Sequence, residues 1–289
     1  MAKVDRVHSS DTQVFVDNVR IPMVNSVSLS SSKNLVDLPT LGVSHIQERV
    51  LGKDQTSRLS LSVIVCTGAS GIDPLYRPQQ RNFGFLNTGK YQFKIKDLAG
   101  VTTISGASLT SYSVNGSVGS VVEGSTSYDG DGAIYTSVGA LDITDQTSNS
   151  YETLDGVVFS PQDIEITTTT NGSEAINSNS MTIQDFTISV SLSREPVTRI
   201  GERTPRFRYP SLPAQGDLSF TAIKNQITGL DLSNIVCQSG VIKIDLKDNG
   251  GNSIMDFTTS GCCLESVDES TDLDDNNTVS FSYYFPIIL

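Results

Sequence analysis

The densest group of reactive side chains is a run of carboxylates in the segment ESVDESTDLDDNN. Its acids are Glu265, Asp268, Glu269, Asp272, Asp274 and Asp275. Carboxylate oxygens are ligands for Ca²⁺, but the run lacks the order D-x-[DN]-x-[DN]-G with a later glutamate that defines an EF-hand loop. The run therefore predicts an acidic surface that repels phosphates or receives a basic partner, and a calcium loop is the alternative hypothesis.

A second group of charged side chains forms a basic patch in the segment REPVTRIGERTPRFRYPSLPAQ. Its candidate contact residues are Arg194, Glu195, Arg199, Arg203, Arg206, Arg208 and Tyr209. Arginine and tyrosine are enriched in protein interfaces, and a basic arm on an acidic protein suits the acidic face of another copy. We therefore expect an inter-subunit loop, with a solvated loop and a nucleic-acid patch as the alternatives.

Groups that catalyse reactions or hold metals are scarce in the sequence. The two histidines, His8 and His45, have no acid or nucleophile beside them in a recognisable motif, and no G-x-S-x-G, H-E-x-x-H or Walker loop occurs. The cysteines lack C-x-x-C spacing, and we expect all of them to be reduced, buried and apolar in character. The sequence therefore predicts neither an enzyme nor a bound cofactor or metal.

The overall composition favours strands and disfavours binding to nucleic acid or membranes. Ser, Thr, Asn and Gly are abundant, and only 37% of the 289 residues are hydrophobic, which is typical of strands and turns. A formal charge of -12 disfavours a protein that grips phosphates, since that requires a basic face. The first residues lack the apolar region of a signal peptide, and no run of 18 apolar residues occurs. We therefore expect a soluble protein made in a cytoplasm, with no membrane segment.

Three blocks of the sequence recur in the same order, which predicts an internal duplication. They match Val27–Ser30 with Val190–Ser193, Gly42–Ile64 with Gly201–Ile223, and Gly89–Asp97 with Gly240–Asp248. The alternative is chance likeness among Ser- and Thr-rich strands, but the shared order and the glycines after the third block favour duplication. We place a first β module at residues 10–130, a connector at residues 131–156 and a second β module at residues 157–289.

Each module is predicted to be a meander of strands with one short helix. Apolar residues at helical spacing place this helix between Ile223 and Val236 in the second module. The matching segment of the first module, Gly71 to Leu86, contains two prolines and is predicted to be mostly loop. The expected fold class is all-β, as two tandem β-sandwich modules.

The second module resembles the tail tube proteins of long-tailed bacteriophages. The resemblance covers a strand, the loop over Arg194–Pro210, the returning strand Gly216–Ile223, a short helix and a hairpin. The first module matches in pattern, but its loop has lost the density of arginine and proline. The resemblance implies tail-tube-like β-sandwich modules that join edge to edge, so that one sheet lines a channel.

For function, the resemblance implies a structural subunit of the virion, made in the host bacterial cytoplasm and built into the tail tube. Rings would stack, the long loop would reach the next ring, and DNA would pass through without specific binding during genome ejection. Two modules in one chain imply trimeric rings with pseudo-sixfold symmetry, with a hexamer as the alternative. The expected partners are other copies of this chain and other tail proteins.

The sequence is also compatible with two other functions. One is another virion ring protein, such as a tail completion or baseplate protein. The other is a carbohydrate-binding β-sandwich module, although the chain has no tryptophan to present on an exposed face.

Overall fold

The protein is described by a computed structural model in which every regular element of the described residues is a β-strand. The structure describes residues 12–21, 23–32, 35–38, 48–51, 56–65, 90–97, 100–132, 134–137, 164–170, 173–177, 182–200, 202, 205–223, 240–247, 251, 253–270 and 277–287. The prediction of an all-β fold is confirmed. The predicted helix after Ile223 and the loop Gly71 to Leu86 lie outside the described residues. Within the described part of the chain, no helix is long and apolar enough to cross a membrane.

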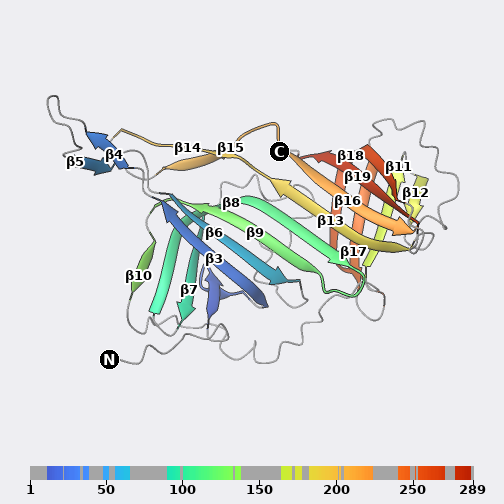
Figure 1. Cartoon of the computed structure of the whole chain (residues 1–289), viewed down its shortest axis with the longest axis horizontal. Coiled ribbons are helices and arrows are strands. Elements are labelled where there is room, and N and C mark those ends of the chain that lie inside the picture. Colours follow the sequence, from blue (N-terminus) through green and yellow to red (C-terminus); the bar gives the residue numbers. More distant parts are fainter. Residues whose placement is uncertain are drawn as a thin grey trace.

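The strands fall into two sets along the chain (Figure 1). The first set is β1 (Gln13–Val16), β2 (Val19–Arg20), β3 (Val24–Ser32), β4 (Leu35–Leu38), β5 (Glu48–Leu51), β6 (Thr56–Ile64), β7 (Tyr91–Asp97), β8 (Gly100–Ser117), β9 (Glu123–Gly130) and β10 (Tyr135–Ser137). The second set is β11 (Ile164–Thr170), β12 (Ser173–Asn177), β13 (Ile183–Ser191), β14 (Arg194–Val197), β15 (Phe207–Pro210), β16 (Gln215–Ile223), β17 (Gly240–Lys247), β18 (Ser253–Ser270) and β19 (Thr278–Pro286). We refer to these sets as the first half and the second half.

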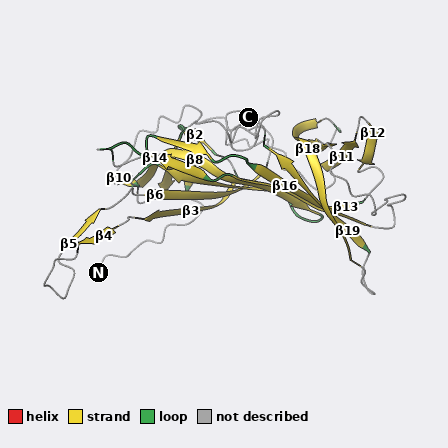
Figure 2. Ribbon diagram, turned by 90° about the horizontal axis from the view of Figure 1, so that it is seen from above, coloured by secondary structure: helices red, strands yellow, loops and turns green. Residues whose placement is uncertain are grey.

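One long antiparallel layer runs through both halves. Its strands follow the order β3-β6-β9-β8-β13-β16-β19-β18, and Figure 2 shows this layer running along the molecule. Side chains alternate between its faces, as in β6, where Leu59, Leu61 and Val63 are buried between exposed or half-buried neighbours. This alternation gives the layer one apolar face and one polar face.

Shorter layers cover the apolar face in each half. In the first half β7 pairs with β1 and with the beginning of β8, and in the second half β17 pairs with β11 and with the beginning of β18. Phe93, Ile95 and Ile104 enter the core from the first cover, and Ile242 and Phe257 enter it from the second. Buried residues of both halves belong to one hydrophobic cluster, so each half is a two-layer sandwich and the halves share a core.

The two longest strands, β8 and β18, pass from the cover into the long layer, and each contains a glycine where it does so. Gly106 has a φ of 67° and Gly261 has a φ of 73°, in the left-handed region that residues with a Cβ atom rarely adopt. Each strand pairs with the cover up to the residue after its glycine, Ala107 or Cys262, and with the long layer beyond that residue. The glycines therefore allow one strand to serve both layers.

Substituting these glycines tests the crossing points. Gly106→Ala should cost more stability than Gly261→Ala, although each forces a residue with a Cβ into a left-handed conformation at about 1–2 kcal/mol. A Cβ at Gly106 would lie 2.7 Å from Asp131 Oδ2, whereas at Gly261 the nearest atom is Pro286 Cγ at 3.2 Å. Urea unfolding of both variants measures the difference. Equal losses would show that the contact with Asp131 relaxes without cost.

Apart from β10, which pairs with β8, the strand pairing of the first half recurs in the described strands of the second half. Leu59 of β6 lies between Leu29 and Tyr128, and Leu218 of β16 lies between Ile188 and Tyr283. The irregularities also recur: the ladder β8–β9 skips a residue after Leu109, and the ladder β18–β19 skips one after Leu264. Residues of the two halves can therefore be equated by their partners. The predicted module boundaries stay predictions.

This equivalence corrects two of the sequence matches. Val27 corresponds to Phe186 and not to Val190, because Val27 lies opposite Leu61 as Phe186 lies opposite Phe220. In the third block, Tyr91 corresponds to Gly240, where the sequence match had placed Gly89. Both errors are even shifts, which preserve the alternation of faces and therefore cannot be detected from the pattern.

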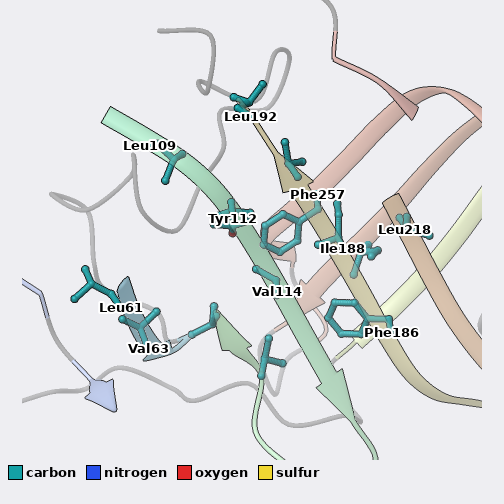
Figure 3. Packing of buried hydrophobic residues seen from close by; sticks show 14 of the residues in the cluster. Leu61, Val63, Leu109, Tyr112, Val114, Phe186, Ile188, Leu192, Leu218 and Phe257 are labelled. Carbon is teal, nitrogen blue, oxygen red and sulfur yellow. The ribbon is translucent and has the colours of Figure 1, made fainter. Parts of the chain in front are cut away.

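The halves are joined by the pairing of β8 with β13. The ladder runs from Ser111 opposite Ser191 to Ser117 opposite Asp185. On its core side Ile188 lies opposite Val114 and Phe186 lies opposite Gly116. Figure 3 shows the side chains of Val114, Ile188 and Phe186 along these two strands. A Cβ at Gly116 would lie 2.7 Å from the Phe186 ring, so this glycine makes room for the ring.

Candidate functional site

The face of the long layer that points away from the core is lined mainly by small polar side chains. Serines oppose one another from strand to strand, as with Ser60, Ser127 and Ser111 on β6, β9 and β8. The Oγ atoms of Ser60 and Ser127 lie 3.1 Å apart, within hydrogen-bonding distance. We call this surface the polar face, and it extends across both halves.

The charged residues of the polar face are acidic with one exception among the described residues. By strand register they are Arg58, Glu123, Asp129, Asp185, Asp217 and Asp268. Arg58 Nε donates to Asp129 Oδ1 at 3.1 Å, so the one cation is already paired with an acid. The described part of this face therefore carries a net negative charge.

The outermost strands of the long layer are β3 and β18, and each has one strand partner in the layer within the described residues. β3 pairs with β6, and the second part of β18 pairs with β19. By the equivalence of the halves, β3 corresponds to β13 and β18 corresponds to β8. The outermost strands are thus the counterparts of the two strands that pair with each other inside the chain.

The pairing of β8 with β13, which we call the internal junction, predicts the register in which β18 of one copy would lie opposite β3 of another. Asn115 opposite Thr187 corresponds to Ser270 opposite Ser28. Val114 opposite Ile188 corresponds to Glu269 opposite Leu29. These pairs are the positions of β3 and β18 that correspond to the pairing of β13 with β8.

The hairpin β14–β15 leaves the second half and is anchored to the first half by buried arginines. Arg208 Nε donates to Asp131 Oδ1 at 2.8 Å, and Arg208 Nη2 donates to the carbonyl of Gly130 at 3.1 Å. Arg194 Nε donates to the carbonyl of Leu109 at 2.6 Å. Both arginines are buried, so these bonds are shielded from water.

Two further groups complete this anchor. Lys90 pairs with the second carboxylate oxygen of Asp131 and donates to the carbonyl of Arg206 at 2.9 Å. Burial lowers the pKa of Arg194 below its ordinary value, and the neighbouring Tyr91 opposes this shift. The Arg194 guanidinium stays charged at neutral pH, because arginine is not deprotonated in proteins. Asp131 therefore lies between the buried guanidinium of Arg208 and the partly exposed ammonium group of Lys90.

Beyond the anchor, the hairpin and its flanks expose apolar side chains. The large ones are Val197, Ile200, Phe207, Tyr209 and Leu212, and Ile200 is fully exposed. The rings of Phe207 and Tyr209 lie 5.9 Å apart, and the Arg206 guanidinium lies 5.5 Å from the centre of the Phe207 ring. We call this group the hairpin patch. Aromatic and arginine side chains together are typical of protein interfaces.

The predicted loop residues divide between these two roles. Arg194 and Arg208 are buried and bond within the chain. Glu195, Arg199, Arg206 and Tyr209 are exposed. Arg203 lies outside the described residues. The sequence indicated the basic character of the loop, but the acceptors of Arg208 lie 77 and 78 residues away in the chain, so its buried partners had no local signal.

The predicted acidic run is also divided. Asp268 lies on the polar face, opposite Ser280, whereas Glu269 lies opposite the buried Val279 and so belongs to the core side of the edge. Glu265 occupies the irregular position between two ladder residues. Asp272, Asp274 and Asp275 lie outside the described residues. The structure therefore brings one predicted acid together with the polar face.

Four acids of the polar face were missed because they are spread along the chain over three strands: Glu123 and Asp129 at opposite ends of β9, Asp185 on β13 and Asp217 on β16. The signal that could have found them is the alternation of side chains along each strand, which places each of these acids on the same side as the serines and threonines.

The cysteines differ from the expectation in one place. Cys262 is a buried free thiol, and burial raises its pKa, so the thiolate is disfavoured. Cys263 is disulfide-bonded, and the prediction that all cysteines are reduced is wrong for this residue. Neighbouring strand residues point to opposite faces, which separates the environments of the two sulfurs.

The described residues thus define an all-β protein with a polar face of net negative charge that extends across both halves, and with outermost strands that correspond to the two strands joining the halves. No protein-family model matches the chain, and no curated protein matches it. Among solved structures, a chain of the virion of a native gene transfer agent particle is similar, with 14% sequence identity and a TM-score of 0.35. The similarity covers 45% of this chain and 98% of that chain.

Proposed function

We propose that the chain is a structural subunit of a bacteriophage tail tube, which polymerises into stacked rings around a channel that conducts DNA into the host cell. The observation that carries the proposal is the correspondence of β3 and β18 with the internally paired β13 and β8. An edge strand with one partner can template pairing with another chain, and closed symmetry satisfies every edge. By resemblance to tail tube proteins, we expect trimeric rings with pseudo-sixfold symmetry.

The polar face supports the channel role. A ring closed through the edges turns one face of the long layer inward, and we assign the polar face to the lumen. Its carboxylates repel the phosphates of DNA, and because it offers almost no cations, no counterion-release gain holds the DNA in place. Asp185, Asp217 and Asp268 are the assigned lumen acids of the second half.

The hairpin patch supports stacking. An exposed cluster of aromatic and aliphatic side chains marks a contact site, and a rigidly anchored one loses little conformational freedom on docking. We assign Phe207, Tyr209 and Ile200 to the contact with the next ring. In this proposal the chain has no catalytic role and binds no cofactor.

Cross-linking in a defined register tests ring formation. The chain carrying Ser28→Cys and Ser270→Cys should form disulfides between copies, because these positions correspond to Thr187 and Asn115, which lie opposite each other. Directly opposite residues on antiparallel strands bring their Cβ atoms to about 4.5–5.5 Å, close to the spacing that a disulfide needs. Denaturing gel electrophoresis should show a ladder of copies that ends at the trimer.

Two controls make the cross-linking result specific. The pair Ser28→Cys with Asp268→Cys is shifted along the strand and should link poorly, whereas Asn115→Cys with Thr187→Cys should link within one chain. A ladder that ends at the hexamer would show that the ring contains six chains and not three. Absence of links in the matched pair, at every protein concentration at which the internal pair forms, would overturn the proposal.

Negative-stain electron microscopy of the wild-type chain separates the remaining alternatives. Hollow tubes support the tail tube, and single rings that never stack favour a tail completion or baseplate protein. Particles that stay monomeric at all concentrations and do not cross-link favour the carbohydrate-binding module.

A further inference from the structure

We propose that the hairpin β4–β5 of one copy docks on the second half of a neighbouring copy, in the way that the hairpin β14–β15 docks on the first half within the chain. This inference rests on the proposed function and deepens it, because it names a contact between copies in addition to the pairing of β3 with β18.

The two hairpins occupy equivalent places in the chain. β4 follows β3, and β14 follows β13, after the same gap of two residues. In the first hairpin Arg49 lies opposite Asp37. In the second hairpin Arg208 lies opposite Pro196, at the same position of the ladder. Arg49 therefore corresponds to Arg208, the arginine that anchors β14–β15 to the first half.

The docking of β14–β15 crosses the internal junction. β13 pairs with β8, and the hairpin that follows β13 bonds to Leu109, Gly130 and Asp131 of the first half. A β3 strand that pairs with β18 of a second copy brings β4–β5 to the counterparts of these residues. The counterparts, in the same order, are Leu264, Phe285 and Pro286.

This end of the second half is less buried than the equivalent end of the first half. Leu109 is 7% exposed and Tyr128 is 1% exposed. Their counterparts, Leu264 and Tyr283, are half-buried, and Pro286 is exposed. We call Leu264, Tyr283 and Pro286 the receiving end. A hairpin that covers these apolar side chains gains the free energy of removing them from water.

The hairpin β4–β5 extends away from the second half of its own chain. Figure 2 shows β4 and β5 beyond β3, at the end of the molecule opposite the second half, whereas β14 lies over the first half. Among the described strands, β4 and β5 pair only with each other. The hairpin is therefore placed to reach a copy that lies beyond the β3 edge.

The acid that serves the anchoring arginine changes place between the two contacts. In the internal contact, Asp131 of the first half pairs with Arg208 of the hairpin. Pro286 stands at the counterpart of Asp131, so the receiving end supplies no carboxylate there. The hairpin supplies one instead, because Asp37 lies directly opposite Arg49, and opposite charges at such positions attract each other. Each contact thus provides one acid for one arginine.

Moving this acid tests the docking. The parent is the chain with Ser28→Cys and Ser270→Cys, and the protein concentration that gives half-maximal cross-linking is measured. Asp37→Ala should raise this concentration by about tenfold, because Arg49 then loses water without a counter-charge when the hairpin docks. Adding Pro286→Asp should bring it back to within about threefold of the parent, because the acid then stands at the counterpart of Asp131.

Two controls separate docking from a general effect of charge. Asn277→Asp adds the same charge to an exposed residue before β19, at the end of that strand remote from Pro286, and should not rescue Asp37→Ala. With Arg49→Ala in place of Asp37→Ala, Pro286→Asp should give no gain, because the arginine that it serves is absent.

The outcomes distinguish this inference from the proposed function. If the parent cross-links normally but Asp37→Ala has no effect, or if Asn277→Asp rescues as well as Pro286→Asp, the docking of β4–β5 at the receiving end is overturned alone. Absence of cross-links in the parent and in every variant overturns the proposed function and this inference together.

Discussion

Asp131→Ala should destabilise the protein by about 3–5 kcal/mol, because it leaves the buried guanidinium of Arg208 without its counter-charge. The Arg208–Asp131 pair is 2.8 Å long, and its side chains are 4% and 9% exposed. Lys90 loses its acidic partner in the same variant. The loss should appear as a lower urea midpoint and as faster tryptic cleavage after Arg206, since the hairpin loses its anchor.

Asp129→Ala is the matched control for this prediction. Asp129, on β9, also pairs with an arginine, but its partner Arg58, on β6, is 65% exposed. Exposed pairs contribute less than about 1 kcal/mol, so this variant should be nearly neutral. A second variant, Asp131→Leu with Arg208→Met, should recover much of the lost stability, because it removes both buried charges. Equal effects of Asp131→Ala and Asp129→Ala would contradict the buried anchor.

Ile188→Ala should cost about 2–5 kcal/mol of folding stability, as expected for a large aliphatic side chain removed from a packed core. Ile188 has no exposed surface and lies at the junction of the halves, opposite Val114. Leu29→Ala removes the equivalent residue at the open edge, where the side chain is half-buried, and should cost about 1 kcal/mol. Urea unfolding of both variants at low protein concentration measures the contrast.

The same two variants should rank in the opposite order in assembly. Leu29→Ala weakens the junction between copies and should raise the concentration needed for rings, measured under conditions where both variants are folded. Ile188→Ala should leave that concentration close to the parent value. If Leu29→Ala assembled normally, Leu29 would not lie at a junction between copies.

The β fold was predictable from the sequence because alternation of apolar and polar residues is a local property. The match between Gly42–Ile64 and Gly201–Ile223 has the register that the structure shows for β6 and β16, and glycine and arginine in that stretch fix it. The match of Val27 with Val190 fails because it rests on alternating serines, which look the same after every even shift.

The sequence predicted a residue of the candidate site only where a charge-rich segment also places that residue on the polar face of its strand. Asp268 satisfies both conditions, whereas Glu269, one residue further, faces the core side of the edge. The role of Arg208 depends on Asp131, which reaches it through tertiary packing, so charge density alone indicated an exposed arm. Burial and register, not residue type, decide which charged groups meet a partner.

The position of the β8–β13 junction also bears on how the chain folds during synthesis. The first half ends with β10 at Ser137, and β13 begins at Ile183, so the edge of β8 is complete before β13 is synthesised. Domains generally fold as units in the order of their synthesis, and a tethered strand meets its neighbour at an effective concentration in the millimolar range. The newly made β13 therefore reaches β8 of its own chain before it meets β8 of any other copy. The order of synthesis thus favours pairing of the two halves within one subunit over pairing between subunits.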